Sequence, residues 1–208
     1  MTRLASIDIG SNSLHLFIVK VGVDNTFEPI ELLRSSLRLG ADWTPEKQGI
    51  SNEKTEIAIA TIKGFVEQAL LHDVDTILCS ATAALREANN QEVFRTRLKT
   101  ELSLNLRVLS GVEEAAIVYR GTRTHLTGEV LLFDLGGRST ELIYGSGPQP
   151  DACLSLPMGH LGLHSLVPTP QPASETDWER LVERALEEIR EVGPMDSEKC
   201  TLCSPSGA

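Results

Sequence analysis

One sequence pattern occurs twice in this chain, and it constrains the fold more than any other feature. The first copy is "SIDIGSNSLHLFIV" at Ser6–Val19, and the second is "FDLGGRSTELIYG" at Phe133–Gly145. Each copy is an apolar strand that ends near an aspartate, followed by a turn of small polar residues and a second apolar strand. The repetition predicts two copies of one fold unit, with Asp8 and Asp134 in equivalent positions.

The elements predicted around the first copy follow an order that is typical of one fold. Strands are expected at residues 4–9, 13–23, 27–39, 75–79 and 106–109, and helices at residues 51–71, 81–88, 91–102 and 112–119. This βββαβαβα order is that of the ribonuclease H-like fold, in which an antiparallel ribbon feeds a mixed sheet with helices on its faces.

The order then restarts around the second copy. Strands are expected at residues 129–133, 139–144, 152–156 and 199–203, and helices at residues 160–166 and 176–191. We therefore expect an α/β chain with two ribonuclease H-like domains, residues 1–124 and residues 125–208. Duplicated units of this kind pack face to face around a cleft, so that their two turns point toward one another.

The second unit is shorter than the first, because no closing helix follows its last predicted strand before Ala208. We expect it to be incomplete, either as a fragment or with a partner that covers it. The apolar residues expected to be exposed are Leu154, Leu156, Leu202 and the apolar side of 176–191. Exposed apolar areas favour association, so a homodimer is one expectation.

The charge and composition limit the classes of partner. The net charge of −10 argues against a broad electrostatic surface for nucleic acid. It leaves room for an anionic substrate, because backbone N–H groups, a metal and one or two arginines can hold phosphate. No apolar run reaches the roughly 18 residues of a membrane span, and Met1–Gly10 lacks the apolar stretch of a signal peptide. We expect a cytoplasmic protein.

The four cysteines include one CxxC pair, Cys200 and Cys203. A zinc site would need a second pair or two histidines nearby, and neither is present. In a strand, residues three apart face opposite sides, which suits neither chelation nor a disulfide. We interpret this pair as structural.

Each of the two turns has two interpretations when it is taken alone. A turn of glycine and serine is often only a hairpin, but its N–H groups also converge on one point in a way that suits phosphate. The aspartate beside it suits a hydrated divalent cation. Because the pattern occurs twice, we favour a clamp that binds a phosphoanhydride with Mg²⁺.

Five segments in order resemble the exopolyphosphatase/guanosine pentaphosphate phosphohydrolase (Ppx/GppA) family, which belongs to the superfamily of actin, heat-shock chaperones and sugar kinases. They are "IDIGSNSLHL" (Ile7–Leu16), "SATAALREANN" (Ser80–Asn90), "LSGVEEAAIVYRG" (Leu109–Gly121), "FDLGGRSTELIYG" (Phe133–Gly145) and "SLPMGHLGLHSL" (Ser155–Leu166). The resemblance implies hydrolysis of a terminal phosphoryl group, with Mg²⁺ as the cofactor.

The resemblance also implies roles for single residues. Glu114 matches the general base for water, whereas Glu113 is expected to be a solvated or structural acid. Without the resemblance, this pair is simply favourable at a helix N-terminus. Arg86 matches a phosphate ligand, although an arginine on a surface helix is also often paired with a glutamate. His15 is expected to be structural.

The remaining implied ligands come from the two turns. The phosphate-binding set is Ser11, Asn12, Ser13, Arg86, Gly136, Gly137, Arg138, Ser139 and Thr140, and the metal-side acids are Asp8, Asp134 and Glu141. Arg138 departs from the family, which usually has a third glycine there. If that position needs a positive φ, arginine costs about 1 kcal/mol. Its side chain either adds a phosphate ligand or blocks the site.

We therefore expect an enzyme that removes terminal phosphate from inorganic polyphosphate or guanosine pentaphosphate. The sequence does not choose between the two substrates. Two alternatives stay open: a non-catalytic sensor that binds a phosphorylated ligand in the same cleft, and an actin-like nucleotide binder.

Overall fold

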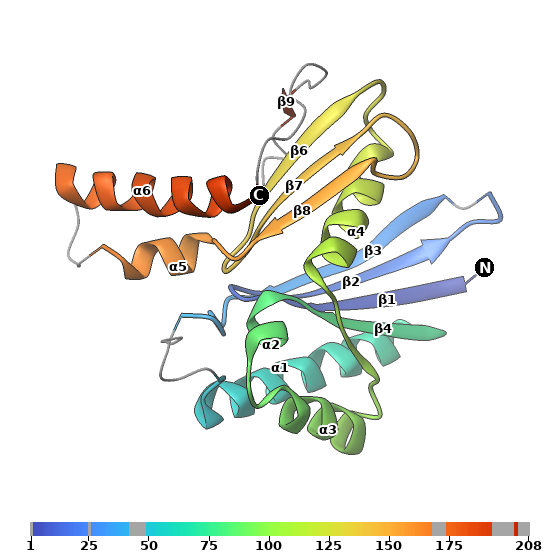
Figure 1. Ribbon diagram of the computed structural model, residues 1–208. Helices are drawn as coiled ribbons and strands as arrows, with labels where there is room; N and C mark the ends of the chain where they lie inside the picture. The colour runs from blue at the N-terminus through green and yellow to red at the C-terminus, as the bar shows by residue number, and fades with distance from the viewer. Residues whose placement is uncertain (1, 25, 42–48, 168–173, 193–201, 204–208) are drawn as a thin grey trace. The chain divides into compact units, whose positions relative to one another are not determined.

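The computed structural model describes residues 2–24, 26–41, 49–167, 174–192 and 202–203 of the chain (Figure 1). The chain divides into two compact units, Met1–Leu109 and Ser110–Ala208. Within the described ranges, no helix combines the length and the apolar character of a membrane span.

The first unit is built on a five-stranded mixed sheet. Its elements are β1 (Thr2–Ile9), β2 (Leu14–Val21), β3 (Phe27–Ser35), α1 (Asn52–Leu71), β4 (Thr76–Ala81), α2 (Ala83–Glu87), α3 (Gln91–Leu102) and β5 (Leu106–Val108). The strand order is β3-β2-β1-β4-β5. The first three strands pair antiparallel, whereas β4 and β5 run parallel to β1. The predicted antiparallel ribbon that feeds a mixed sheet is confirmed.

One face of this sheet forms the core of the first unit. Alternate residues of β1 and β2, among them Ile7, Ile9 and Leu16, are fully buried and pack in one cluster with Ile62 and Phe65 of α1. Helices α1 and α3 lie on the same side of the sheet (Figure 1). Each buried side chain of this size stabilises the fold by about 1.5–3 kcal/mol. This packing fixes the direction of β1 and thus the position of the turn that follows it.

The second unit contains a four-stranded sheet. Its elements are α4 (Gly111–Arg123), β6 (Val130–Leu135), β7 (Thr140–Gly145), β8 (Ala152–Leu156), α5 (His160–Ser165), α6 (Glu175–Val192) and β9 (Leu202–Cys203). The strand order is β8-β7-β6-β9, with β6, β7 and β8 antiparallel and β9 parallel to β6. Of the strand expected at 199–203, only the last two residues lie in the described ranges.

Helix α4 packs on the sheet of the second unit. Ala115 and Tyr119 are fully buried in a cluster with Val130, Leu132 and Ile143. The division by packing therefore falls before α4, whereas the boundary that we expected at 124/125 falls after it.

The exposed apolar residues of the second unit differ in part from those expected. The expectation was wrong for Leu156, which is only 2% exposed, while Leu154 is half-buried. The segment after β8 stays close to the start of β7, since the Thr140 hydroxyl donates to the Met158 carbonyl, and Met158 is itself buried. The strand residues that are exposed are Phe133 and Leu135 of β6, at 40% and 47%. The Leu202 side chain and Cys200 lie outside what the structure describes.

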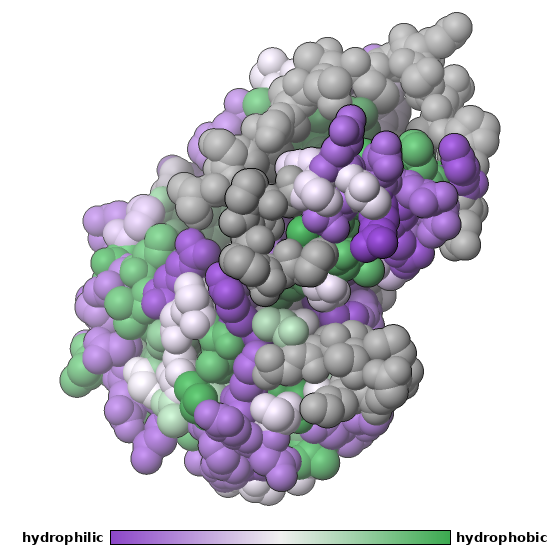
Figure 2. Space-filling view, turned by 90° about the vertical axis from the view of Figure 1, so that its left-hand side faces the viewer, coloured by the Kyte–Doolittle hydropathy of each residue, from purple (hydrophilic) through white to green (hydrophobic). Residues whose placement is uncertain are grey.

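Helix α6 exposes its apolar side, as expected. Trp178 is 61% exposed, and Val182, Leu186 and Ile189 on the same stripe are exposed as well. On the face drawn in Figure 2, hydrophobic areas lie between hydrophilic ones. The expected homodimer stays a prediction.

Candidate active site

The two turns have the same hydrogen bond and the same register. Gly10 N donates to Ser13 O at 3.0 Å, and Gly136 N donates to Ser139 O at 2.9 Å. In each copy, the aspartate pairs across the hairpin with the residue two positions after that serine. These pairs are Asp8 with His15 and Asp134 with Glu141. The predicted equivalence of Asp8 and Asp134 is confirmed.

A close approach explains the glycine in each Asp-x-Gly pattern. A Cβ at Gly10 would lie 2.8 Å from Ser13 O, and a Cβ at Gly136 would lie 3.0 Å from Ser139 O. Either contact is tighter than ordinary packing allows. Glycine therefore lets each turn close directly after its aspartate.

The turn of the first unit is held by its own side chains and by α2. The buried Ser11 hydroxyl accepts a hydrogen bond from Ala84 N at 3.1 Å. Ser13 Oγ lies 3.3 Å from His15 Nε2, and His15 Nδ1 lies 3.7 Å from Asp8 Oδ2. His15 is thus partnered within its own hairpin, as expected for a structural histidine.

Arg86 lies on the helix that supports this turn. Its Nη1 donates to Leu109 O at 3.0 Å, so part of the guanidinium fixes the chain just before α4. A guanidinium has five N–H donors in a planar fork. The structure thus brings Asp8, Ser11–Ser13 and the helix of Arg86 together in the first unit, and the phosphate-binding role of Arg86 stays a prediction.

The turn of the second unit is bracketed by the segment after β8. His160 N donates to Gly136 O at 3.0 Å, and Leu161 N donates to Gly137 O at 2.8 Å. A Cβ at Gly159 would lie 2.3 Å from Arg138 N. The fifth motif, "SLPMGHLGLHSL", therefore contains the backbone donors that hold the turn of the fourth motif in place.

Arg138 occupies the position that the family usually fills with glycine. It is half-buried, and its φ is not positive, because the non-glycine residues with positive φ in the described ranges are Arg38, Asp73 and Ser103. The backbone cost considered from the sequence does not apply here.

The two adjacent acids at the start of α4 have different surroundings. Ser110 caps the helix: its hydroxyl accepts from Glu113 N at 3.2 Å, and the Glu113 carboxylate accepts from Ser110 N at 2.8 Å. This reciprocal capping box makes Glu113 structural, as expected. Glu114 follows it and contributes to the electrostatic field at Glu141.

Glu141 is a buried acid among other acids. It is 1% exposed, and it accepts a hydrogen bond from Ser155 Oγ at 2.8 Å. Burial, with the charges of Glu114 and Asp134, raises the pKa of Glu141 from 4.5 to about 7, although hydrogen bonds from Ser155 and Ser139 oppose the rise. The structure thus brings Glu114, Asp134, Glu141 and the turn 136–140 together in the second unit.

Asp134 and Glu141 suit a magnesium ion if water and substrate phosphates supply its other ligands. Within the described ranges, no three His, Cys, Asp or Glu side chains form a group that could hold a metal ion by themselves. Asp134 and Glu141 are cross-strand neighbours with oxygen donors. Mg²⁺ is usually bound by one or two carboxylates, with water and substrate phosphates as its other ligands. The donor set fits such a two-carboxylate site.

The family of the chain follows from its match to a protein-family model. The model of the Ppx/GppA phosphatase family matches residues 17–197. The chain belongs to the Ppx/GppA phosphatase family. The resemblance expected from the five motifs is confirmed.

Curated Ppx/GppA relatives are longer than this chain. Exopolyphosphatase 1 of Mycobacterium leprae is 30% identical over 160 residues, which are 76% of this chain and 47% of that protein. Exopolyphosphatase 1 of Mycobacterium tuberculosis is 31% identical over 160 residues, 76% of this chain and 46% of that protein. The chain thus spans about half the length of these relatives.

Solved Ppx/GppA structures share the fold. The Aquifex aeolicus family member has a TM-score of 0.78 at 30% identity, over 99% of this chain and 66% of that one. An exopolyphosphatase from Cytophaga hutchinsonii has a TM-score of 0.83 at 24% identity, over 99% and 67%, and shows the fold alone. A chain of the PilM–PilN type IV pilus biogenesis complex, at 12% identity and a TM-score of 0.56, likewise shares the fold alone.

Sequence reasoning missed two contacts of this candidate site. The first is the capping contact through which Glu113 is structural, and it could have been found because Ser110 and Glu113 have the spacing of a capping box. Ser155, which donates to Glu141, had no such signal. It was inside a recognised motif, but its partner lies on another strand.

Proposed function

We propose that this chain provides the catalytic groups of a hydrolase that removes the terminal phosphate from inorganic polyphosphate or guanosine pentaphosphate. Family membership and relatives named exopolyphosphatase support the reaction class. The observation that carries the proposal is the buried Glu141 beside the turn of Asp134, with Glu114 close enough for its charge to raise the pKa of Glu141.

Glu114 is the proposed general base. Attack by water on a terminal phosphorus needs a carboxylate that orients the water and accepts its proton. Glu113 is held by the cap, whereas Glu114 lies one residue further along the first turn of α4 and close enough to influence Glu141. Because Glu141 is buried, little water screens its electrostatic interaction with Glu114.

The two turns are the proposed phosphate ligands. Ser11, Ser13, Ser139 and Thr140 are buried, and the hydroxyls of Ser11, Ser13 and Thr140 are engaged in shaping the turns. Phosphate binding by 11–13 and 136–140 would therefore rest mainly on backbone N–H groups. Arg86 and Arg138 would add charge-assisted hydrogen bonds.

Magnesium is the proposed cofactor. Asp134 and Glu141 would hold it from the second unit and Asp8 from the first, and the bound ion would neutralise charge on the phosphates. That both turns act on one substrate across a cleft is part of the proposal, and the repeated motif supports it. The same motif would place both aspartates beside the phosphates.

Phosphate release tests the proposal against its non-catalytic alternative. The 208-residue chain is incubated with Mg²⁺ and either long-chain polyphosphate or guanosine pentaphosphate, and released phosphate is measured. Turnover that disappears in Glu114→Gln supports the hydrolase. Binding of polyphosphate without release by the wild type would instead support a sensor.

A further inference from the structure

Ser155 lies where two of the proposed active-site segments meet. It sits on β8 directly opposite Glu141 on β7. Its hydroxyl donates to Glu141 Oε1 at 2.8 Å. Asp134, Glu141 and Ser155 are therefore consecutive cross-strand neighbours on one face of the sheet. The carboxylate of Glu141 is 1% exposed, so a hydrogen bond to it is little weakened by competing water.

The same side chain touches the beginning of α4. A Cβ at Gly111, the first residue of that helix, would lie 2.3 Å from Ser155 Cβ and 2.4 Å from Ser155 Oγ. The backbone of α4 therefore packs directly on the Ser155 side chain. Glu114 follows three residues later, within about one helical turn. Ser155 thus lies between Glu141 and the turn that carries Glu114.

The first unit has no equivalent of this arrangement. Its register places Arg34 of β3 opposite His15, as Ser155 of β8 lies opposite Glu141. A short hydroxyl side chain at this position occurs only in the copy that has two acids to arrange. The difference between the copies indicates that Ser155 serves the acidic site rather than the hairpin as such.

We propose that Ser155 is a positioning residue, whose hydroxyl fixes the Glu141 carboxylate and whose side chain sets the distance between that carboxylate and the first turn of α4. This inference rests on the proposed hydrolase function. Residues that orient the acids of a metal or water site through one hydrogen bond typically change affinity or activity by about 10- to 100-fold when they are removed.

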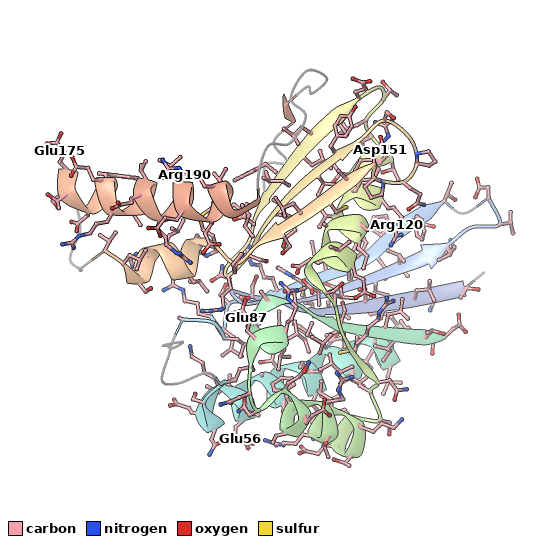
Figure 3. The ribbon with its side chains drawn as sticks, viewed as in Figure 1. Glu56, Glu87, Arg120, Asp151, Glu175 and Arg190 are labelled. Atoms are coloured by element: carbon pink, nitrogen blue, oxygen red, sulfur yellow. The ribbon has the colours of Figure 1, made fainter. Side chains whose placement is uncertain are left out.

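The test compares Ser155→Ala with a matched serine. Ser146 also donates its hydroxyl to a carboxylate, that of Asp151 at 3.0 Å, in the loop at the other end of β7 (Figure 3). We expect Ser155→Ala to lower kcat by about 10- to 100-fold, with KM changed less than about threefold, because the phosphate-binding turn is untouched. Ser146→Ala should leave both constants within about twofold.

A double-mutant cycle distinguishes a positioning role of Ser155 from a general loss of packing. It combines Ser155→Ala with Glu141→Ala, which removes the acceptor of the Ser155 hydroxyl, and follows kcat and the melting temperature at pH 8. If Ser155 acts through Glu141, Ser155→Ala lowers kcat and the melting temperature less in the Glu141→Ala background than in the wild type. The melting temperature is measurable in all four variants, even where turnover falls below detection.

The outcomes distinguish this inference from the proposed function. A wild-type chain that releases no phosphate overturns the hydrolase. An active wild type with an equally active Ser155→Ala variant overturns only the role of Ser155. Equal losses of melting temperature in both backgrounds also overturn it, because they show a packing effect that does not pass through Glu141.

Discussion

Glu141 carries a carboxyl group that is buried in the second unit and faced by two further acids. Burial, together with Glu114 and Asp134, raises the pKa of Glu141 to about 7. In the unfolded chain this group has its ordinary pKa of 4.5. The folded chain therefore binds more protons than the unfolded chain between pH 4.5 and 7. Stability from this group is fully present below pH 4.5 and is lost as the pH rises through 7.

The Glu141→Gln variant should remove this pH-dependent loss. Glutamine keeps an acceptor for Ser155 and presents donors to the neighbouring carboxylates. We expect the variant to melt at a higher temperature than the wild type at pH 8, with a smaller difference at pH 5, both measured in a metal chelator. Each unit of pKa corresponds to about 1.4 kcal/mol. A variant that is less stable than the wild type at pH 8 would contradict this account of Glu141.

Arg138 provides a second prediction for a single residue. Its φ is not positive, so Arg138→Gly relieves no backbone strain. If the guanidinium binds substrate phosphate, the variant should raise KM for polyphosphate about tenfold or more, as expected for the loss of a charge-assisted hydrogen bond. A rise in kcat would show that Arg138 blocks the site. Unchanged constants would remove it from the site.

At the scale of elements, α4 carries Glu113 and Glu114 in its first turn and packs on the sheet of the second unit. It begins at a capping box that uses Glu113, it packs on Ser155 through Gly111, and it buries Tyr119 farther along. The Tyr119 hydroxyl donates to Gly147 O at 2.7 Å. The position of Glu114 therefore depends on how closely the first turn of α4 approaches β8.

Two glycines of α4 test this dependence with opposite signs. Gly111→Ala would place a Cβ 2.3 Å from Ser155, whereas a Cβ at Gly121 meets nothing within 4 Å. We expect Gly111→Ala to destabilise the chain by about 1–3 kcal/mol. Gly121→Ala should stabilise it by about 0.5–1 kcal/mol, because alanine favours the helix. Chemical denaturation measures both, and equal effects would mean that α4 does not pack tightly on β8.

The sequence predicted the elements better than the contacts between them. Apolar periodicity is local, so the order of strands and helices and the antiparallel ribbon of the first unit were predictable. Glu113 and Glu114 could be told apart by the rules of helix capping. Ser155 could not be assigned, because it meets Gly111 and Glu141 only when α4, β7 and β8 pack together. For the same reason, the packing of α4 on the second sheet and the burial of Leu156 were not foreseen.

At the scale of the whole molecule, the chain is a repeat whose two copies have diverged. Both copies keep the aspartate and the glycine-closed turn. The residue opposite the aspartate is His15 in the first copy and Glu141 in the second. The first turn thus has a histidine beside its acid, whereas the second has a cluster of acids. The divergence supports the metal-side roles that we propose for Asp134 and Glu141 in the second unit.

The two aspartates should be needed for activity without being needed for folding. Asp134→Asn removes a like charge near Glu141, and Asp8→Asn weakens a partly exposed contact with His15, which contributes at most about 1 kcal/mol. We expect each variant to keep its melting temperature within a few degrees and to lose about tenfold or more of the Mg²⁺-dependent phosphate release. Full activity in both, or unfolding of both, would argue against paired aspartates at one substrate.

The most direct measurement compares kcat for phosphate release from polyphosphate in Glu114→Gln and Glu113→Gln. These neighbours differ by one position on α4, and glutamine can replace glutamate in a capping box. The account predicts that Glu114→Gln lowers kcat by about 10²- to 10⁴-fold, as expected for the loss of a general base, with little change in KM. Glu113→Gln should keep kcat within about threefold of the wild type. An active Glu114→Gln variant, or an equal loss in both variants, would contradict the assignment of Glu114 as the base.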